Sequence, residues 1–337
     1  MASGISVIIC CYNSSLRLDE TLKHLINQKT HGFNWELIVV DNASTDNTEA
    51  YARRVLTDVK NIDFTIVREP ESGLSYARKK GYTVAKYEYL LFCDDDNWLA
   101  DNYLQLTYET MQVNPKIGIL GGHASAVFEI AEPVWFKQYQ LDFAVGEQPY
   151  CNKPLMRVKE VYGAGFTISK LYLDKLYGSG FKSILSDRKG DQLISGGDTE
   201  LCYLAKYFGF EVWYYRELRL QHFMAKGRLT WNYLKRLYEG KGRTIVYTLA
   251  YQYVEIHGRV PTQNLRLPFW LDTFLYKAKQ MLKFYPEIRH KMNDEGDADV
   301  LLYIAMKAEA REIWNLKGRY SQLFNDIVVN QNAGKDK

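Results

Sequence analysis

The chain has 337 residues, of which 47% are hydrophobic and 25% charged, values that are ordinary for a globular protein with a sizeable core. The formal net charge of +3 is too small to indicate a nucleic-acid partner. No apolar run approaches the roughly 18 residues that a membrane-spanning helix needs, and the polar start lacks a signal-peptide pattern, so we expect a soluble or membrane-peripheral protein.

Short β-branched runs alternate with helical patterns over the first third of the chain. The predicted strands are residues 6–10, 36–40, 64–67 and 89–93. Apolar residues at helical spacing follow the first strand, a helix start signal follows the second, and a helix at 74–86 follows the third. Continuous apolar strands that alternate with helices predict an α/β fold with a mostly parallel sheet covered on both faces.

The remainder of the chain is less regular. Two more strands are predicted at 117–120 and 212–215, and the proline-containing stretch 132–156 predicts a long loop or lid. After about residue 223 the pattern becomes helical and basic, with a last helix at 300–316. We expect a disordered tail at 330–337.

The five cysteines show no spacing typical of a zinc site. Three of them lie in or beside apolar strand-like runs, where buried free thiols are expected. Free thiols persist in a reducing compartment, so the cysteines favour a cytoplasmic protein.

Polar side chains follow three of the predicted strands at the point where each strand ends. The loop 11–14 follows the first strand, Asp41 follows the second, and Asp94, Asp95 and Asp96 follow the fourth. In open α/β sheets, ligands bind outside the carboxyl ends of the strands. The sequence therefore predicts one ligand site that these three segments share.

The Asp triplet predicts a divalent metal site. Adjacent carboxylates raise one another's pKa unless a cation neutralises them, and Mg²⁺ or Mn²⁺ with oxygen ligands is a simple remedy. A solvated acidic turn that caps the next helix is the alternative. The apolar strand before the triplet and Trp98-Leu99 after it indicate a fixed loop, which favours the metal.

Two common phosphate-binding motifs are missing from the sequence. There is no GxxxxGK[ST] loop, which disfavours a P-loop nucleotidase, and no GxGxxG after the first strand, which disfavours a dinucleotide site. Another group must hold any phosphates, and a metal ion can do so.

At this point the sequence resembles family 2 glycosyltransferases, the inverting enzymes with the GT-A fold, over roughly residues 5–225. The segments that carry the resemblance are SVIICCYN (6–13), DNASTD (41–46), GLSYAR (73–78), FCDDD (92–96), GAGF (163–166) and GDTEL (197–201). The resemblance implies a GT-A catalytic domain at 1–223 and a helical C-terminal extension at 224–329. Within that domain, it implies a nucleotide-sugar half at about 1–115 and an acceptor half at about 116–223.

The resemblance also implies which residues bind the donor and the metal. Asp41 would pair with the uracil, Tyr12 would stack on the base, and Asp94 would contact the ribose or a water on the metal. Asp96 would bind the metal, and His222 would complete its ligands. The other residues that we expect in the donor site are Asn13, Ser44, Gly73, Arg78 and Asp95.

Asp198 is the predicted general base, because a sugar hydroxyl is a poor nucleophile until a carboxylate takes its proton. Its alternative role is to cap the helix that begins beside it. For the acceptor we expect contacts from Trp135, Gly163, Gly165 and Glu200. Trp135 could instead belong to a small core under its loop, and Glu200 could instead pair with a nearby Lys or Arg.

The basic, aromatic segment after residue 223 is the sequence feature that indicates which partners the protein binds. Such a segment is typical of a helix at a membrane surface, and it is equally consistent with a helix that packs on the catalytic domain. We expect a nucleotide-sugar donor, UDP-linked, and a glycan or lipid-linked glycan acceptor of bacterial surface polysaccharide synthesis. The rival hypotheses are a sugar-phosphate nucleotidyltransferase and a non-catalytic glycan-binding protein.

Overall fold

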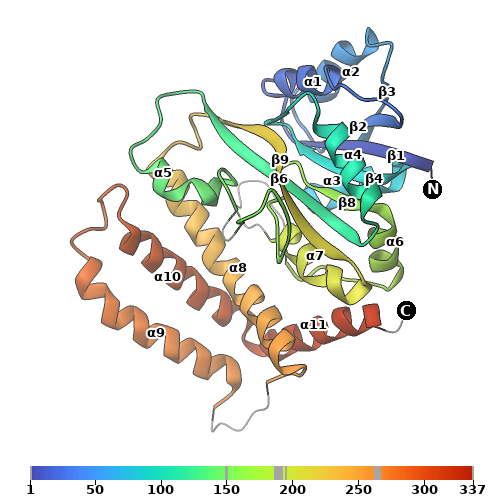
Figure 1. Ribbon diagram of the computed structural model, residues 1–337. Coiled ribbons are helices and arrows are strands. Elements are labelled where there is room, and N and C mark those ends of the chain that lie inside the picture. The colour runs from blue at the N-terminus through green and yellow to red at the C-terminus, as the bar shows by residue number, and fades with distance from the viewer. Residues whose placement is uncertain (1, 149–150, 186–192, 194–195, 262–266, 336–337) are drawn as a thin grey trace.

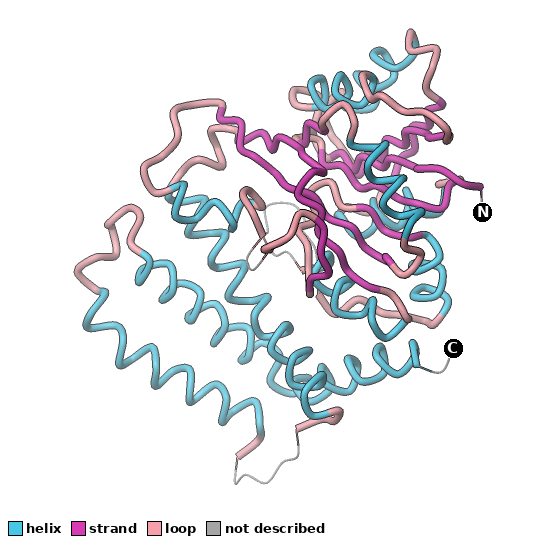
Figure 2. Tube along the Cα trace, in the orientation of Figure 1, coloured by secondary structure: helices cyan, strands magenta, loops and turns pink. Residues whose placement is uncertain are grey.

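A nine-stranded sheet organises the protein in the computed structural model, which describes residues 2–148, 151–185, 193, 196–261 and 267–335 (Figures 1 and 2). The strand order is β3-β2-β1-β4-β8-β6-β9-β5, and β7 pairs with β9. The strands are β1 (Ala2–Cys11), β2 (Asn34–Asn42), β3 (Asp63–Glu69), β4 (Tyr87–Asp94), β5 (Asn97–Leu99), β6 (Ile117–Phe128), β7 (Leu155–Val158), β8 (Thr167–Ser169) and β9 (Glu211–Met224).

The first four strands confirm the parallel sheet expected from their apolar runs. β1 pairs in parallel with β2 and β4, and β2 pairs in parallel with β3. Successive residues of β1 point to opposite faces, and both faces are buried: Ile8 packs in one core cluster, while Val7 and Ile9 pack in another. The carboxyl ends of β1, β2 and β4 therefore lie at one edge of the sheet.

The second half of the sheet adds short antiparallel pairings to this parallel arrangement. β6 and β9 pair in parallel, but β4–β8, β6–β8, β5–β9 and β7–β9 are antiparallel. The strands responsible are short, since β5 and β8 have three residues each and β7 has four. A hydropathy pattern cannot reveal strands of this length.

Helices cover both faces of the sheet. The cluster that contains Val7 and Ile9 also takes side chains from α1 and α4, and the cluster that contains Ile8 takes side chains from α3 and α6. The helices of the sheet domain are α1 (Leu18–Ile26), α2 (Thr48–Thr57), α3 (Leu74–Val84), α4 (Tyr103–Val113), α5 (Phe136–Tyr139), α6 (Lys170–Gly178) and α7 (Gly197–Ala205). Short 3-10 helices lie at Gln140–Phe143, Lys206–Phe208 and Lys317–Arg319.

The C-terminal extension is helical, as expected, and lies beside the sheet domain (Figure 1). It consists of α8 (Trp231–His257), α9 (Phe269–Ile288), α10 (Ala298–Leu316) and α11 (Tyr320–Lys335). α8 begins at a Thr230 cap, whose hydroxyl accepts a hydrogen bond from the Tyr233 N–H at 3.1 Å. No described helix combines the length and the apolar composition needed to cross a bilayer.

The expectation of a disordered tail at 330–337 is wrong, because α11 extends to Lys335. Phe324 and Ile327 on this helix are buried in the core, and Asn330 and Gln331 are buried as well. The Asn330 side chain also donates to the Lys182 carbonyl at 3.0 Å. The last residues of α11 are polar, and its buried apolar residues lie on the preceding turns of the same helix. The polar composition of the tail therefore did not indicate a helix.

Candidate active site

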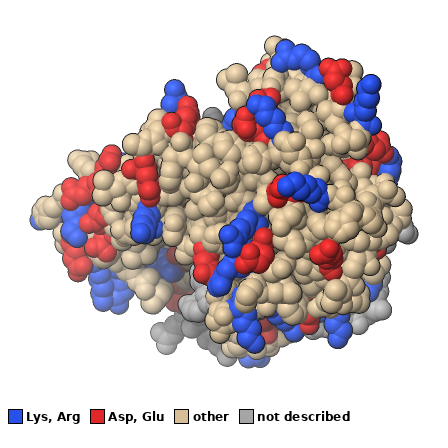
Figure 3. Space-filling model, turned by 45° about the horizontal axis from the view of Figure 1, so that its top comes forward, with Lys and Arg blue, Asp and Glu red and all other residues tan. Residues whose placement is uncertain are grey.

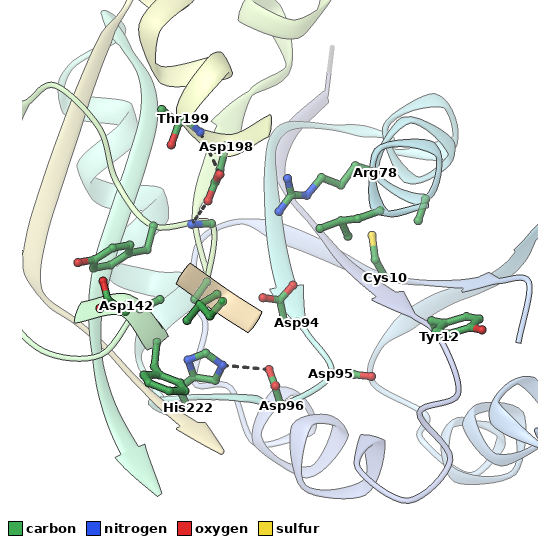
Figure 4. A pocket seen from close by; sticks show the side chains of 18 of the residues that line it. Cys10, Tyr12, Arg78, Asp94, Asp95, Asp96, Asp142, Asp198, Thr199 and His222 are labelled. Carbon is green, nitrogen blue, oxygen red and sulfur yellow. Dashed lines mark hydrogen bonds and ion pairs between the residues drawn. The ribbon is translucent and has the colours of Figure 1, made fainter. Parts of the chain in front are cut away.

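A pocket of about 680 Å³ opens at the carboxyl ends of β1 and β4, where the sequence predicts a ligand site. Residues that are distant in sequence meet here: Asp94 and Asp96 line one side, and Asp198 lines another (Figure 4). α8 contributes a further wall through Leu237 and Lys241. The structure therefore brings Asp94, Asp96 and Asp198 to one cavity as expected, whereas Asp41 is not among the residues that line it.

The three aspartates of the triplet have different environments. All three line the cavity, but the Asp95 side chain points away from those of Asp94 and Asp96 (Figure 4). Asp95 accepts a hydrogen bond from the Ser14 hydroxyl and pairs with Arg17 at 2.7 Å. Burial raises the pKa of the Asp95 carboxyl and the Asp96 carboxylate raises it further, while Arg17 acts in the opposite direction. Asp95 thus anchors the loop, and its expected donor contact stays a prediction.

His222 lies beside Asp96 because β5 turns the chain back onto β9. In this antiparallel pairing Asn97 is opposite His222, and the Phe223 N–H donates to the Asp96 carbonyl at 2.8 Å. The result is a separation of 3.4 Å between the His222 Nε2 and Asp96 Oδ1 atoms. The imidazole and the carboxylate are thus held side by side by backbone pairing.

These side chains suit a divalent cation in kind. A carboxylate oxygen and an imidazole nitrogen are both ligands of Mn²⁺ and related ions. The space between them, however, receives the Arg228 guanidinium, whose Nη1 lies 2.8 Å from Asp96 Oδ2 and 3.0 Å from His222 Nε2. Among the described residues no group of three His, Cys, Asp or Glu side chains is already arranged around a metal position. The donors therefore fit an ion once Arg228 withdraws.

The loops after β1 and β2 hold each other in place. Asn13, which has a positive φ of 51°, accepts a hydrogen bond from the Thr45 N–H at 2.8 Å, and its own N–H donates to Ser44 Oγ at 3.0 Å. Neither Asn13 nor Ser44 lines the pocket. Tyr12 does line it and is 45% exposed, so its ring is accessible to a ligand.

Asp41 lies at the end of β2 and is 4% exposed. Its Oδ1 atom has no hydrogen-bond partner among the residues that the structure describes. The next residue, Asn42, lines the pocket, and its side-chain oxygen accepts from the Gly73 N–H at 2.8 Å. Gly73 has a φ of 145°, which favours glycine at this turn into α3.

Asp198 is held at the start of α7. Its Oδ2 atom accepts from the Gly163 N–H at 2.9 Å, and its Oδ1 atom accepts from the Thr199 N–H at 3.0 Å. The Arg78 guanidinium stacks over the Phe166 ring at 5.1 Å and points toward the space between Asp198 and Asp94 (Figure 4). A Cβ at Gly163 would lie 2.8 Å from Asp198 Oδ2 and 3.1 Å from Arg78, so this glycine makes room for both charges.

Glu200 is a correction, because the structure buries it outside the pocket, and no Lys or Arg among the described residues pairs with it. It is 1% exposed and accepts hydrogen bonds from the Tyr251 and Ser183 hydroxyls, each at 2.6 Å, and from the Ile184 N–H at 2.9 Å. Tyr251 is on α8, so Glu200 joins the helix that carries Asp198 to the C-terminal extension. Burial raises the pKa of Glu200 to about 7, although these hydrogen bonds oppose the rise.

Glu200 is expected to make folding stability depend on pH. Because its pKa rises from 4.5 to about 7 on folding, the native state holds the proton more tightly, and this stabilisation is lost as pH rises through that interval. Glu200→Gln lacks this titrating group and serves as the reference. Between roughly pH 5 and pH 8, the free energy of unfolding of wild type should fall by about 2 kcal/mol relative to that of Glu200→Gln. Chemical unfolding at several pH values measures this difference. A constant difference would show that Glu200 stays ionised throughout.

Two other residues expected at the acceptor lie outside the pocket. Trp135 is 7% exposed and belongs to a satellite core with Phe143 and Trp231, which is the alternative that its sequence context left open. This core forms because part of the stretch expected to be a loop or lid is helical, in α5 and the following 3-10 turn. Gly165 has a φ of 69° and lies behind the cavity, where its carbonyl accepts from the Tyr103 hydroxyl at 2.8 Å. Gly163 lines the pocket as expected.

Sequence reasoning missed several residues of the site. Arg17 and Arg228 pair with the Asp triplet from segments far from it in sequence, and Glu160, Tyr162 and Asp142 also line the pocket. The basic residues after position 223 were the available signal for Arg228. We interpreted them as a helix at a membrane surface or on the catalytic domain, and not as partners of the acidic cluster.

The comparisons with known proteins agree with this geometry. Residues 6–171 match the model of glycosyl transferase family 2. A glycosyltransferase, GlyG, of Streptococcus pneumoniae is 28% identical over 36% of this chain and 40% of its own length. A poly-beta-1,6-N-acetyl-D-glucosamine synthase of Staphylococcus epidermidis is 31% identical over 36% of this chain and 28% of its own length. The chain thus matches less than half of the length of these relatives.

Solved structures share the fold over a larger part of the chain. S. aureus TarS in complex with UDP-GlcNAc superposes with a TM-score of 0.51 and 14% identity, covering 95% of this chain and 92% of TarS. GalNAc-T7 with UDP, GalNAc and Mn²⁺ superposes with a TM-score of 0.52 and 17% identity, covering 75% of this chain and 51% of that one. The chain therefore has the GT-A fold, and through residues 6–171 it belongs to glycosyl transferase family 2.

Proposed function

We propose that this protein is an inverting glycosyltransferase that moves a sugar from a UDP-linked donor to a hydroxyl group of a glycan acceptor. The observation that carries the proposal is the single cavity in which Asp94, Asp96 and His222 lie on one side and Asp198 on another. Such a cavity can hold a diphosphate near the first group and an attacking hydroxyl near the second. A binding module would gain nothing from a carboxylate on each side.

The donor end of the cavity suits a nucleotide. The buried Asp41 Oδ1 atom can accept a hydrogen bond from the imide N–H of uracil, and a buried acceptor gains most from such a partner. The exposed Tyr12 ring at the pocket edge can stack on the base. The UDP and UDP-GlcNAc in the related structures support the same choice of nucleotide.

The leaving diphosphate requires positive charge. Asp96 and His222 would hold a Mg²⁺ or Mn²⁺ ion, and the bound ion would neutralise charge on the phosphate oxygens. Mn²⁺ in the GalNAc-T7 structure supports this use of a metal. Arg78 and Lys241 also line the pocket and bring cationic groups to the same cavity.

Asp198 would act as the general base. The acceptor oxygen forms its bond to the anomeric carbon as the bond from that carbon to the diphosphate oxygen breaks, and the hydroxyl proton passes to the Asp198 carboxylate. A single displacement of this kind inverts the anomeric configuration. Two backbone N–H donors keep the Asp198 carboxylate oriented, because Gly163 and Thr199 each bind one of its oxygens.

The acceptor would be a growing or lipid-linked glycan of a bacterial surface polysaccharide. The poly-beta-1,6-N-acetyl-D-glucosamine synthase supports the polysaccharide class.

A cytoplasmic location, peripheral to the membrane, stays a prediction of the sequence. On the face shown in Figure 3 acidic and basic side chains are interspersed, and on α8 Lys241 pairs with Asp142 and Arg243 with Glu239. The Lys241–Asp142 pair joins α8 to the sheet domain and supports the packing role of this helix.

A screen of nucleotide-sugars tests the proposal. Incubated with Mn²⁺ and without acceptor, the protein should slowly release UDP from one UDP-sugar, and a chelator should stop the release. The same sugar nucleotide should raise the melting temperature, since a ligand that binds only the native state stabilises it. Pyrophosphate release from UTP and a sugar 1-phosphate would instead identify a nucleotidyltransferase, and a thermal shift with no release in either assay would identify a binding protein.

A further inference from the structure

Arg228 occupies the position that a cation at Asp96 and His222 would need. Its Nη1 atom lies 2.8 Å from Asp96 Oδ2 and 3.0 Å from His222 Nε2. The side chains of all three residues are largely buried, with exposed fractions of 15% for Arg228, 16% for Asp96 and 6% for His222. The guanidinium carries no acceptor, so this contact is a hydrogen bond in the tautomer whose Nε2 is unprotonated, which is also the form that binds a metal.

The backbone around Arg228 connects the donor site to the C-terminal extension. Arg228 lies between the end of β9 and the start of α8, in a turn whose N–H donates to the Ala225 carbonyl at 2.8 Å. Two residues later, Thr230 caps α8. α8 then lines the pocket with residues 237, 241, 244, 245 and 248. A movement of Arg228 would therefore take place directly before the helix that forms a pocket wall.

We propose that Arg228 is an exchangeable internal counter-ion: it neutralises Asp96 in the empty pocket and leaves when a divalent cation binds to Asp96 and His222. Both cations require the His222 Nε2 atom, whose single lone pair serves only one of them, so they cannot be bound there at once. The exchange sets the concentration of metal that the protein needs, because metal binds only the fraction of molecules in which Arg228 has withdrawn. It also couples metal binding to the start of α8.

The proposal rests on the proposed use of a metal, and direct binding of Mn²⁺ in the absence of nucleotide tests it. Calorimetric titration should show that Arg228→Gln binds Mn²⁺ at least about tenfold more tightly than wild type, since a charged pair with two hydrogen bonds no longer competes. Arg228→Lys, with a point charge and a shorter reach, should show an intermediate affinity. Arg219→Gln removes the same charge from an exposed side chain of β9 and should match wild type.

The outcomes separate this inference from the proposed function. Equal Mn²⁺ affinities in wild type and both Arg228 variants would overturn the exchange, as would the absence of Mn²⁺ binding in every variant. Sugar transfer that persists in a chelator would overturn the proposed use of metal instead. Melting curves identify any variant that fails to fold, and Arg228→Lys then carries the comparison with wild type.

Discussion

Asp198→Asn is expected to lower the turnover of sugar transfer by about 10²–10⁴-fold, because the amide cannot take the proton of the acceptor hydroxyl. Donor binding should change little, since Asp198 lies on the opposite side of the pocket from Asp94 and Asp96 (Figure 4). Asparagine keeps one oxygen that can accept from the Gly163 or Thr199 N–H, so α7 should keep its position. Initial rates of UDP release with acceptor, beside calorimetry with the UDP-sugar, measure the two effects.

A matched control for this variant is Asp174→Asn on α6. Asp174 accepts a hydrogen bond from the Tyr82 hydroxyl at 2.6 Å and is not among the residues that line the pocket. This variant should transfer sugar at the wild-type rate. Wild-type turnover in Asp198→Asn would remove Asp198 from the mechanism and leave it the role of a helix cap.

Asp96→Ala is expected to weaken binding of the UDP-sugar in Mn²⁺ by at least about 100-fold. Loss of groups that merely support a metal ligand already costs about 10–100-fold in metal affinity, and loss of the ligand itself should cost at least as much. The substitution also removes the carboxylate that pairs with Arg228 at 2.8 Å. Calorimetric titration of the UDP-sugar, with Mn²⁺ and with a chelator, measures the effect.

The comparison in chelator shows whether the loss comes from the metal. Without free metal, wild type and Asp96→Ala should bind the UDP-sugar with similar, weak affinities. Asp101→Ala is the control, because Asp101 follows β5 closely but is exposed and pairs with Lys29. Unchanged affinity of Asp96→Ala in Mn²⁺ would exclude Asp96 as a ligand.

The parts of the fold that could be predicted are those with strong local patterns. The first four strands are continuous apolar runs buried on both faces, and residues such as Val7 and Val39 identify them without any tertiary information. The positions of Asp94 and Asp198 followed from rules about strand ends and from family motifs. Both sources of information are local in sequence, so they can be used before a structure is known.

The features that could not be predicted depend on contacts between distant segments. Arg228 pairs with Asp96 across 132 positions of sequence, and no periodicity in the sequence predicts such a pair. Glu200 was expected to contact the acceptor or to pair with a nearby Lys or Arg. Burial against Tyr251 reversed that expectation, and this contact depends on how α8 packs.

The hydrogen bond between Tyr251 and Glu200 limits how the two parts of the protein can be recombined. Glu200 lies two residues from Asp198 on α7, and its phenolic donor comes from α8. A chimaera that took its helical extension from another enzyme would lose this donor unless position 251 kept a tyrosine. The buried carboxylate would then lack one of its partners, at a cost of about 1–3 kcal/mol. Divergence of the extension toward new acceptors is therefore constrained at this one side chain even where every surface residue is free to vary.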